Sequence, residues 1–245
     1  MSEAASSTRQ RDLPLITFEN VDLQRAGRKL FSGFSLSVTE HRIGLVGHNG
    51  SGKSSLLRLI HGLLKPDAGT VRTLGLDTAK EASQLPAQVG FLFQNPDHQI
   101  LFPTVSEEIS FGLLNQGLHA SEVDQRVKAI LTDYGCEAWG KRAVDELSGG
   151  QKQLVCLMAV MVLEPRLLLL DEPFASLDFA TRLSFIKRMR KLQPGAVIAS
   201  HDLELLQDCD RVLWLEQGAV KADGHPKDIL PAYQAEAIAR AEKEL

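Results

Sequence analysis

The chain has 245 residues, 44% of them hydrophobic, and its formal net charge is −4. This length and apolar content suit one large α/β domain better than two full domains. The acidic balance disfavours nucleic acid as a partner, and the longest apolar runs are shorter than the ~20 residues that a transmembrane helix needs, so we do not expect direct membrane insertion.

Composition divides the chain into three parts. Residues 1–12 are polar, with serines and mixed charges, and predict a disordered tail. Residues 13–230 carry the alternating apolar segments of one folded domain. Residues 231–245 place glutamate and arginine four apart, which predicts a solvated C-terminal helix. The three cysteines stand far apart, and we interpret them as reduced core residues of a cytoplasmic protein.

Two segments near the N-terminus predict strands of an antiparallel sheet. Leu15–Val21 and Phe34–Val38 alternate apolar and polar side chains, as half-buried strands do. Between them, Arg25 to Lys29 is expected to form a basic loop. A further strand is expected around Thr70 to Thr73, after a turn that contains Pro66 and Gly69.

The segment Gly47–Ser54 fits the pattern G-x-x-x-x-G-K-[ST]. It lies between an apolar strand at Ile43–Val46 and a helix. Its glycines allow successive N–H groups to turn toward a phosphate at the positive end of the helix. Lys53 would reach the β- and γ-phosphates, and the Ser54 hydroxyl would bind Mg²⁺. The expected phosphate-binding residues are Gly47, His48, Asn49, Gly50, Ser51, Gly52, Lys53, Ser54 and Ser55.

A helical insert is expected at about 105–150. It follows a buried strand at Val89–Phe93, which leads directly into Gln94. Within the insert, Ser121 is the expected N-cap of a helix whose apolar face comprises Val123, Val127, Ile130 and Leu131. A long apolar helix then begins after Leu147–Gln151, and Pro165 ends it.

A second chemical motif follows, because Leu167–Leu170 predicts a buried strand that delivers Asp171 and Glu172 at its C-terminal end. Asp171 suits a Mg²⁺ ligand, and Glu172 can orient and deprotonate a water. Another strand, Ala196–Ala199, ends at Ser200 and His201. These elements alternate with helices at Phe179–Leu192 and Leu203–Gln207, which predicts a parallel sheet, and a hairpin is expected around Glu216–Gly218.

Together these motifs closely resemble the ATP-binding cassette family, over nearly all of residues 15–225. The motifs are Gly47–Ser54, Gln94, Leu147–Gln151, Leu170–Pro173, Ser176–Asp178 and His201. The resemblance implies an α/β phosphate-loop NTPase cassette with a parallel-sheet core, an antiparallel β subdomain and a helical insert. It also implies an ATPase that uses Mg²⁺ and ATP.

In this family two cassettes pack head to tail around two ATP molecules, so the resemblance implies a second ATPase chain as partner. The L-S-G-G-Q residues Ser148, Gly149, Gly150 and Gln151 would face the ATP that the other chain binds. The helix start at these residues can point N–H groups at phosphate. By the same resemblance, Gln94 senses Mg²⁺ and the attacking water, His201 contacts the γ-phosphate, and Asp178 links the two sites.

One position departs from the family pattern. Where members usually stack an aromatic side chain on adenine, this chain aligns Arg25. A guanidinium can also stack flat on a base. The alternative is a solvated loop arginine.

Gln94–Gln99 resembles the Q-N-P-D-x-Q stretch of energy-coupling-factor importers, which take up vitamins or transition metals. The resemblance implies a transmembrane coupling protein and a substrate-capture membrane protein as partners, at the cytoplasmic face of the membrane. Biotin is favoured as substrate, with cobalt or nickel next. Asp97 is the expected acceptor for an arginine of the coupling protein, unless it only caps a short helix. The competing function is a soluble ATPase that acts as a mechanical switch.

Overall fold

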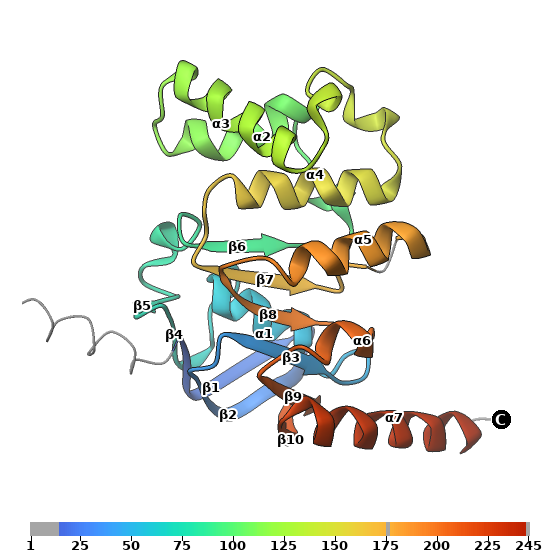
Figure 1. The fold of residues 1–245 in the computed structure, drawn as a ribbon. Coiled ribbons are helices and arrows are strands. Elements are labelled where there is room, and N and C mark those ends of the chain that lie inside the picture. The colour runs from blue at the N-terminus through green and yellow to red at the C-terminus, as the bar shows by residue number, and fades with distance from the viewer. Residues whose placement is uncertain (1–14, 175–176, 244–245) are drawn as a thin grey trace, which may run out of the picture. The chain divides into compact units, whose positions relative to one another are not determined.

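The computed structural model describes residues 15–174 and 177–243, and the tail expected at 1–12 lies outside these ranges. The chain forms two compact units (Figure 1). Unit 1 comprises Met1–Pro86 and Ala196–Leu245, and unit 2 comprises Ala87–Gly195.

Unit 1 contains an antiparallel sheet with the strand order β2-β1-β4-β5. Its first two strands are longer than predicted, because Ala26 and Gly27 alone form the turn between them, with φ of 49° and 75°. Two positive φ values match the twist of a tight hairpin. The basic loop expected at Arg25–Lys29 is therefore mostly strand. The strands are β1 (Ile16–Arg25), β2 (Arg28–Val38), β4 (Ala68–Thr73) and β5 (Leu76–Asp77).

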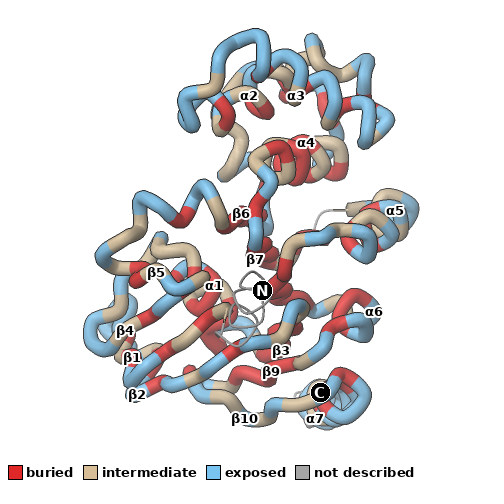
Figure 2. Tube along the Cα trace, turned by 60° about the vertical axis from the view of Figure 1, so that its left-hand side comes forward, coloured by how far each residue is buried: buried red, intermediate tan, exposed pale blue. Residues whose placement is uncertain are grey.

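The second set of strands in unit 1 surrounds β3, the strand before the phosphate loop. β3 pairs in parallel with β8 on one side and β9 on the other, and β10 pairs antiparallel with β9. Strands β3, β8 and β9 are almost wholly buried, as the apolar runs predicted (Figure 2). The strands are β3 (Arg42–Val46), β8 (Gly195–Ala199), β9 (Arg211–Glu216) and β10 (Ala219–Gly224).

Three α-helices are described in unit 1: α1 (Lys53–His61), α6 (Leu203–Leu206) and α7 (Pro226–Lys243). A 3₁₀ turn, η1 (Ala82–Gln84), follows β5. The last helix begins five residues before the predicted start at 231, and Pro226 occupies a first-turn position that suits proline. It is also not simply solvated, because Ile229, Leu230 and Tyr233 are buried.

Unit 2 contains the parallel pair β6 (Val89–Leu92) and β7 (Leu167–Asp171). An apolar core of α2, α3 and α4 side chains forms in its helical part. Val123, Val127 and Leu131 lie in that core as predicted, but α3 begins at Ala120 with His119 as N-cap, so the assignment of Ser121 as cap was wrong. The α-helices are α2 (Val105–Asn115), α3 (Ala120–Asp133), α4 (Gly149–Met161) and α5 (Phe179–Met189), and the 3₁₀ turns are η2 (Pro96–His98), η3 (Glu137–Trp139) and η4 (Val144–Glu146).

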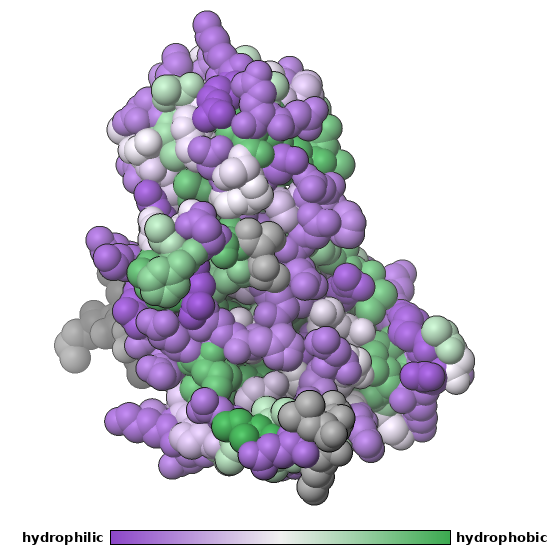
Figure 3. Space-filling view, turned by 90° about the vertical axis from the view of Figure 1, so that its right-hand side faces the viewer, coloured by the Kyte–Doolittle hydropathy of each residue, from purple (hydrophilic) through white to green (hydrophobic). Residues whose placement is uncertain are grey.

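Over residues 15–174 and 177–243, no helix is both long enough and apolar enough to cross a membrane. Figure 3 shows a face on which hydrophilic side chains predominate and apolar ones form separate patches. The three cysteines are buried and free of disulfides. Burial raises the pKa of Cys156 and of Cys209 to about 12, so both thiols stay protonated at neutral pH.

Candidate nucleotide site

The phosphate loop joins β3 to α1 through glycines that no other residue could replace without strain. Gly47 has φ of 150°, Gly50 of 82° and Gly52 of 109°. A Cβ on Gly47 would overlap the carbonyl oxygen of Leu215, and one on Gly52 would lie 2.9 Å from Cζ of Phe31. The loop thus takes a backbone path that ordinary side chains prohibit, which is the condition for turning its amides inward.

Lys53 is the first residue of α1 and folds back over the loop. Its Nζ donates hydrogen bonds to the carbonyl oxygens of Gly47 at 2.7 Å and His48 at 3.3 Å. The residue is only 7% exposed, so these carbonyls hold an ammonium group that has lost most of its water. No acidic side chain occupies the first turn of α1 to neutralise the helix N-terminus. A positive site of this kind suits an anion.

Ser51 connects the loop to the β9–β10 hairpin. Its N–H donates to the His48 carbonyl at 3.1 Å, and its own carbonyl accepts from the Gly218 N–H at 3.3 Å. The residue is 5% exposed, and its hydroxyl has no hydrogen-bond partner among the described residues. Ser54 and Ser55 follow in the first turn of α1, which places two hydroxyl groups next to the loop.

His201, which follows β8, lies beside the phosphate loop within unit 1. Its Nε2 is 3.3 Å from Oδ1 of Asn49, and its Nδ1 is 3.5 Å from the hydroxyl oxygen of Tyr233 on α7. The same hydroxyl is 3.5 Å from the Gly47 carbonyl oxygen. The sequence predicted the loop and His201 as parts of one site, and the structure brings them together. It also adds Tyr233, which the sequence analysis missed.

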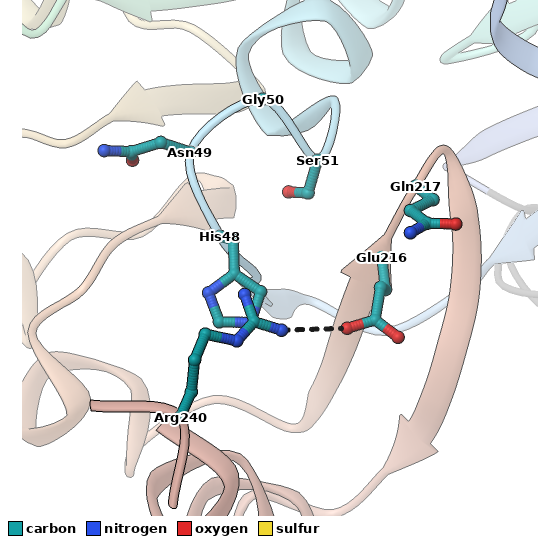
Figure 4. Close-up of a pocket in the computed structure, with 7 residues that line it drawn as sticks. All are labelled: His48, Asn49, Gly50, Ser51, Glu216, Gln217 and Arg240. Carbon is teal, nitrogen blue, oxygen red and sulfur yellow. Dashed lines mark ion pairs between the residues drawn. The ribbon is translucent and has the colours of Figure 1, made fainter. Parts of the chain in front are cut away.

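On its α7 side, the loop borders a pocket of about 220 Å³ (Figure 4). Arg240 lies against His48 there and pairs with Glu216 at 3.6 Å. Burial lowers the pKa of His48, and the nearby Arg240 cation lowers it further. The lining residues are His48, Asn49, Gly50, Ser51, Glu216, Gln217 and Arg240.

Ligand atoms of His48, Glu216 and Glu236 lie within 4.8 Å of one another, a spacing that could suit a metal. However, the Lys221 ammonium is 3.1 Å from Glu216 and 2.6 Å from Glu236. Lys221 therefore already supplies the positive charge between these carboxylates, and the group is best described as an ion-pair network.

In unit 2, the predicted carboxylates stand at the end of β7. Asp171 is the last strand residue and is 4% exposed. Glu172 follows with φ of +47°, a left-handed conformation that costs a non-glycine residue free energy. Strained backbone of this kind often occurs at functional sites, where the surrounding structure fixes a side chain in position.

Gln94 follows β6 and is exposed. The residue before it, Phe93, is held by the half-buried Gln99 and the buried Gln153. The Phe93 N–H donates to Oε1 of Gln99 at 3.1 Å, and the Phe93 carbonyl accepts from Nε2 of Gln153 at 3.2 Å. Gln153 belongs to α4, the helix that begins with the L-S-G-G-Q segment, so this helix anchors the residue directly before Gln94. The sequence analysis missed Gln153, whose position in an apolar helix was the available signal.

The L-S-G-G-Q segment forms the start of α4. Ser148 is the N-cap: its hydroxyl accepts from the Gln151 N–H at 3.3 Å, and Oε1 of Gln151 accepts from the Ser148 N–H at 3.0 Å. This reciprocal arrangement is a capping box. Gly149 and Gly150 begin the helix itself. The end of α4 therefore carries the fixed, positive N-terminus that the motif predicted.

Three other predicted residues have local partners. Asp178 caps α5 by accepting from the Thr181 N–H at 3.0 Å, and the hydrogen bond from the Thr181 hydroxyl lowers the pKa of Asp178. Arg25 donates to the Gln24 carbonyl at 2.9 Å and is exposed. Asp97 pairs with Nζ of Lys152 at 2.7 Å. The cap of η2 is Asn95, so the alternative in which Asp97 caps that turn was wrong.

Comparisons of the sequence and the fold relate the chain to known proteins. The sequence model of the family described as "ABC transporter" matches residues 31–175. The biotin transport ATP-binding protein BioM of Rhodobacter capsulatus is 47% identical over 92% of this chain and 97% of its own, and BioM of Rhizobium etli is 40% identical over 92% and 96%. The solved structure of cbiO1 from Clostridium perfringens, described as part of the ABC transporter complex cbiONQ, superimposes with a TM-score of 0.78 at 29% identity over 96% of both chains.

Proposed function

This chain belongs to the ABC transporter family, and we propose that it is the ATP-hydrolysing subunit that energises an energy-coupling-factor importer for biotin. It is an ATPase that couples ATP hydrolysis to transport. The observation that carries the biotin proposal is the 47% identity to a biotin transport protein over 92% of this chain. A second relative of 40% identity is also described as a biotin transport protein.

ATP binding begins at the phosphate loop. The loop amides and the N-terminus of α1 stabilise the phosphate oxygens, because they offer N–H donors and a partial positive charge. The Lys53 ammonium, now held by the Gly47 and His48 carbonyls, would transfer to the β- and γ-phosphates. Arg25 would contact adenine by stacking.

Hydrolysis then needs a base and groups that recognise the γ-phosphate. We assign Glu172 as the residue that orients and deprotonates the attacking water, and Gln94 as the residue that senses that water. His201 contacts the γ-phosphate through the imidazole nitrogen that faces Asn49. These roles follow from the family resemblance and from the local geometry of each residue within its own unit.

Mg²⁺ fits the donor set that the chain provides. Ser54 offers a hydroxyl oxygen, Asp171 a buried carboxylate and Gln94 an amide oxygen, and hard oxygen ligands are those that Mg²⁺ prefers. When bound, the ion would neutralise charge on the phosphates.

The start of α4 is the part of this chain that we propose meets a second ATPase chain. Ser148 and Gln151 cap it, and the partial positive charge of its N-terminus suits a phosphate. We propose that Ser148, Gly149 and Gly150 contact the ATP bound by a second ATPase chain, with Gln151 and Asp178 supporting that interface. The further partners are a transmembrane coupling protein and a substrate-capture membrane protein, which place the chain at the cytoplasmic face of the membrane.

Two variants test the chemistry. Glu172→Gln keeps the side-chain shape and removes the base, so it should bind ATP, lose turnover and accumulate as a closed dimer in gel filtration with ATP. Lys53→Ala should abolish high-affinity ATP binding in nucleotide titrations. Turnover near the wild-type rate in Glu172→Gln would contradict the assignment of the base.

Transport is tested by isolating the tagged chain from detergent-solubilised membranes of its native host. Recovery with two integral membrane proteins, together with loss of biotin uptake in the Glu172→Gln strain, would support the proposal. Loss of cobalt or nickel uptake instead would change the substrate. Isolation without any membrane protein would favour the soluble mechanical ATPase.

A further inference from the structure

We propose that Tyr233, on the C-terminal helix α7, is a positioning residue for His201. Its hydroxyl fixes the imidazole in the tautomer that carries the proton on Nε2, the nitrogen turned toward Asn49 of the phosphate loop. This inference rests on the proposed role of His201 at the γ-phosphate and extends it to a helix that lies outside the matched family segment at 31–175.

Both nitrogens of the His201 ring face polar atoms of unit 1. Nε2 is 3.3 Å from Oδ1 of Asn49, and Nδ1 is 3.5 Å from the Tyr233 hydroxyl oxygen. An amide oxygen can only accept a hydrogen bond, whereas a tyrosine hydroxyl can donate one or accept one. The arrangement is therefore satisfied when Nε2 carries the proton and Tyr233 donates to Nδ1.

Another acceptor near the Tyr233 hydroxyl is the Gly47 carbonyl, whose oxygen is also 3.5 Å away. An imidazole nitrogen is a stronger hydrogen-bond acceptor than a backbone carbonyl, whether or not the Gly47 carbonyl also accepts from the Lys53 ammonium, as it does here at 2.7 Å. Nδ1 is thus the better acceptor for the Tyr233 proton. The partner of one imidazole nitrogen determines which nitrogen is protonated, and an Nε2–H group is the donor that a phosphate oxygen requires.

The Tyr233 hydroxyl can orient the His201 imidazole only if the Tyr233 ring is itself held in place. Tyr233 is 7% exposed, and its ring meets Trp214 edge to face, with centroids 5.3 Å apart and planes at 87°. Trp214 of β9 is in register with Val46, the residue directly before Gly47. The tyrosine is therefore anchored to the strand pair that begins the phosphate loop.

Ion pairs hold the same face of α7 against the β9–β10 hairpin. Glu236 and Arg240 follow Tyr233 at spacings of three and seven, so the three side chains share one side of the helix. Glu236 pairs with Lys221 at 2.6 Å, and Arg240 pairs with Glu216 at 3.6 Å (Figure 4). The Lys221 ammonium also lies 4.3 Å from the Trp214 ring centroid. The helix is thus held in place by several contacts, and its Tyr233 hydroxyl lies 3.5 Å from His201 Nδ1.

The test compares the full-length wild type with Tyr233→Phe, which removes the hydroxyl and keeps the ring contacts. The chain is labelled with ¹⁵N-histidine, and the ring nitrogen resonances are recorded at pH 8, with His201→Gln identifying the signals of that residue among the seven histidines. We expect an Nε2–H tautomer in the wild type, with an Nδ1 resonance displaced by the accepted hydrogen bond. In Tyr233→Phe that resonance should move toward the value of a solvated imidazole.

Turnover provides the second measurement. Loss of one neutral hydrogen bond should lower kcat roughly 2- to 10-fold while the KM for ATP stays within about twofold. In a His201→Ala background, adding Tyr233→Phe should cause no further loss. Tyr134→Phe is the matched control, because Tyr134 is the only other tyrosine of the chain and belongs to unit 2. It should change neither the His201 signals nor kcat.

An unchanged His201 Nδ1 resonance in Tyr233→Phe would overturn the inference, as would an equal loss of turnover in the His201→Ala background. A displaced resonance would sustain the contact even if His201→Ala hydrolysed ATP at the wild-type rate. In that case the role of His201 in the proposed function would be wrong.

Discussion

The Ser148 hydroxyl caps α4 in this structure, and we propose that it also contacts the ATP of a partner chain. Thr104 provides a matched control, because it forms the same kind of capping box with Glu107 at the start of α2 in the same unit. The hydroxyl–amide distances are similar, 3.3 Å for Ser148 and 3.4 Å for Thr104. Replacing either by alanine removes one cap.

The expected cost of either cap is about 1 kcal/mol. For a chain of this size, that change should lower Tm by about 2–4 °C in both Ser148→Ala and Thr104→Ala. A lost hydrogen bond to a charged phosphate costs more, about 1.5–3 kcal/mol. If Ser148 also contacts ATP, the ATP turnover of Ser148→Ala should therefore fall roughly 10- to 100-fold, while that of Thr104→Ala stays close to wild type.

The measurements are thermal unfolding without nucleotide and steady-state ATP hydrolysis at a temperature well below both midpoints. Equal turnover in the two variants would refute the phosphate contact and leave Ser148 as a cap alone. Unchanged Tm in Ser148→Ala would refute the capping argument instead. Tm therefore reports the helix cap, and ATP turnover reports the phosphate contact.

If Arg25 stacks on adenine, Arg25→Ala should weaken ATP binding about fivefold (about 1 kcal/mol) in nucleotide titrations, and Arg25→Tyr should restore it; equal affinities would make Arg25 a solvated residue. Asp97→Ala should reduce recovery of the chain with its membrane partners while its ATPase rate is unchanged, and Lys152→Ala, which breaks the same ion pair, should not reduce recovery if Asp97 itself docks. Cys156 and Cys209 should resist alkylation at pH 8 until the chain unfolds. Because their folded pKa values of about 12 exceed the ordinary value of 9.0, stability should fall as the pH rises from about 9 toward 12 in denaturant titrations.

The sequence predicted the central strands and the nucleotide motifs well, because those signals are local. The run Leu167–Leu170 is apolar enough to require burial, and the glycines at 47, 50 and 52 specify a backbone path by themselves. The family fold was confirmed by the comparisons. The roles of the individual site residues stay predictions.

Element boundaries were less predictable, since they depend on turns and caps. The segment at Arg25–Lys29 looked like a loop by charge, but Ala26 and Gly27 accommodate the whole turn. Ser121 is a good capping residue by type, and yet α3 begins before it. Residue type alone does not determine where a helix begins when neighbouring backbone already supports an earlier start.

The C-terminal helix shows a different limit. Its charged residues predicted solvation, whereas within unit 1 it packs against β9 and β10, the hairpin that precedes it in the chain. Tyr233, Glu236 and Arg240 share a face, which was the available signal, but their partners at His201, Lys221 and Glu216 belong to other elements. Long-range pairing of this kind is not encoded in a local pattern.

The positive φ of Glu172 has a consequence for evolution and engineering. A glycine at that position would avoid the left-handed penalty of about 1–2 kcal/mol, offset in part by its greater unfolded-state entropy of about 0.5–1 kcal/mol. On backbone conformation alone, selection for heat resistance would therefore favour loss of the proposed base, and a screen for stable variants would enrich inactive ones. Persistence of glutamate there depends on continued demand for turnover, and relaxed demand should let the position drift toward glycine or asparagine first.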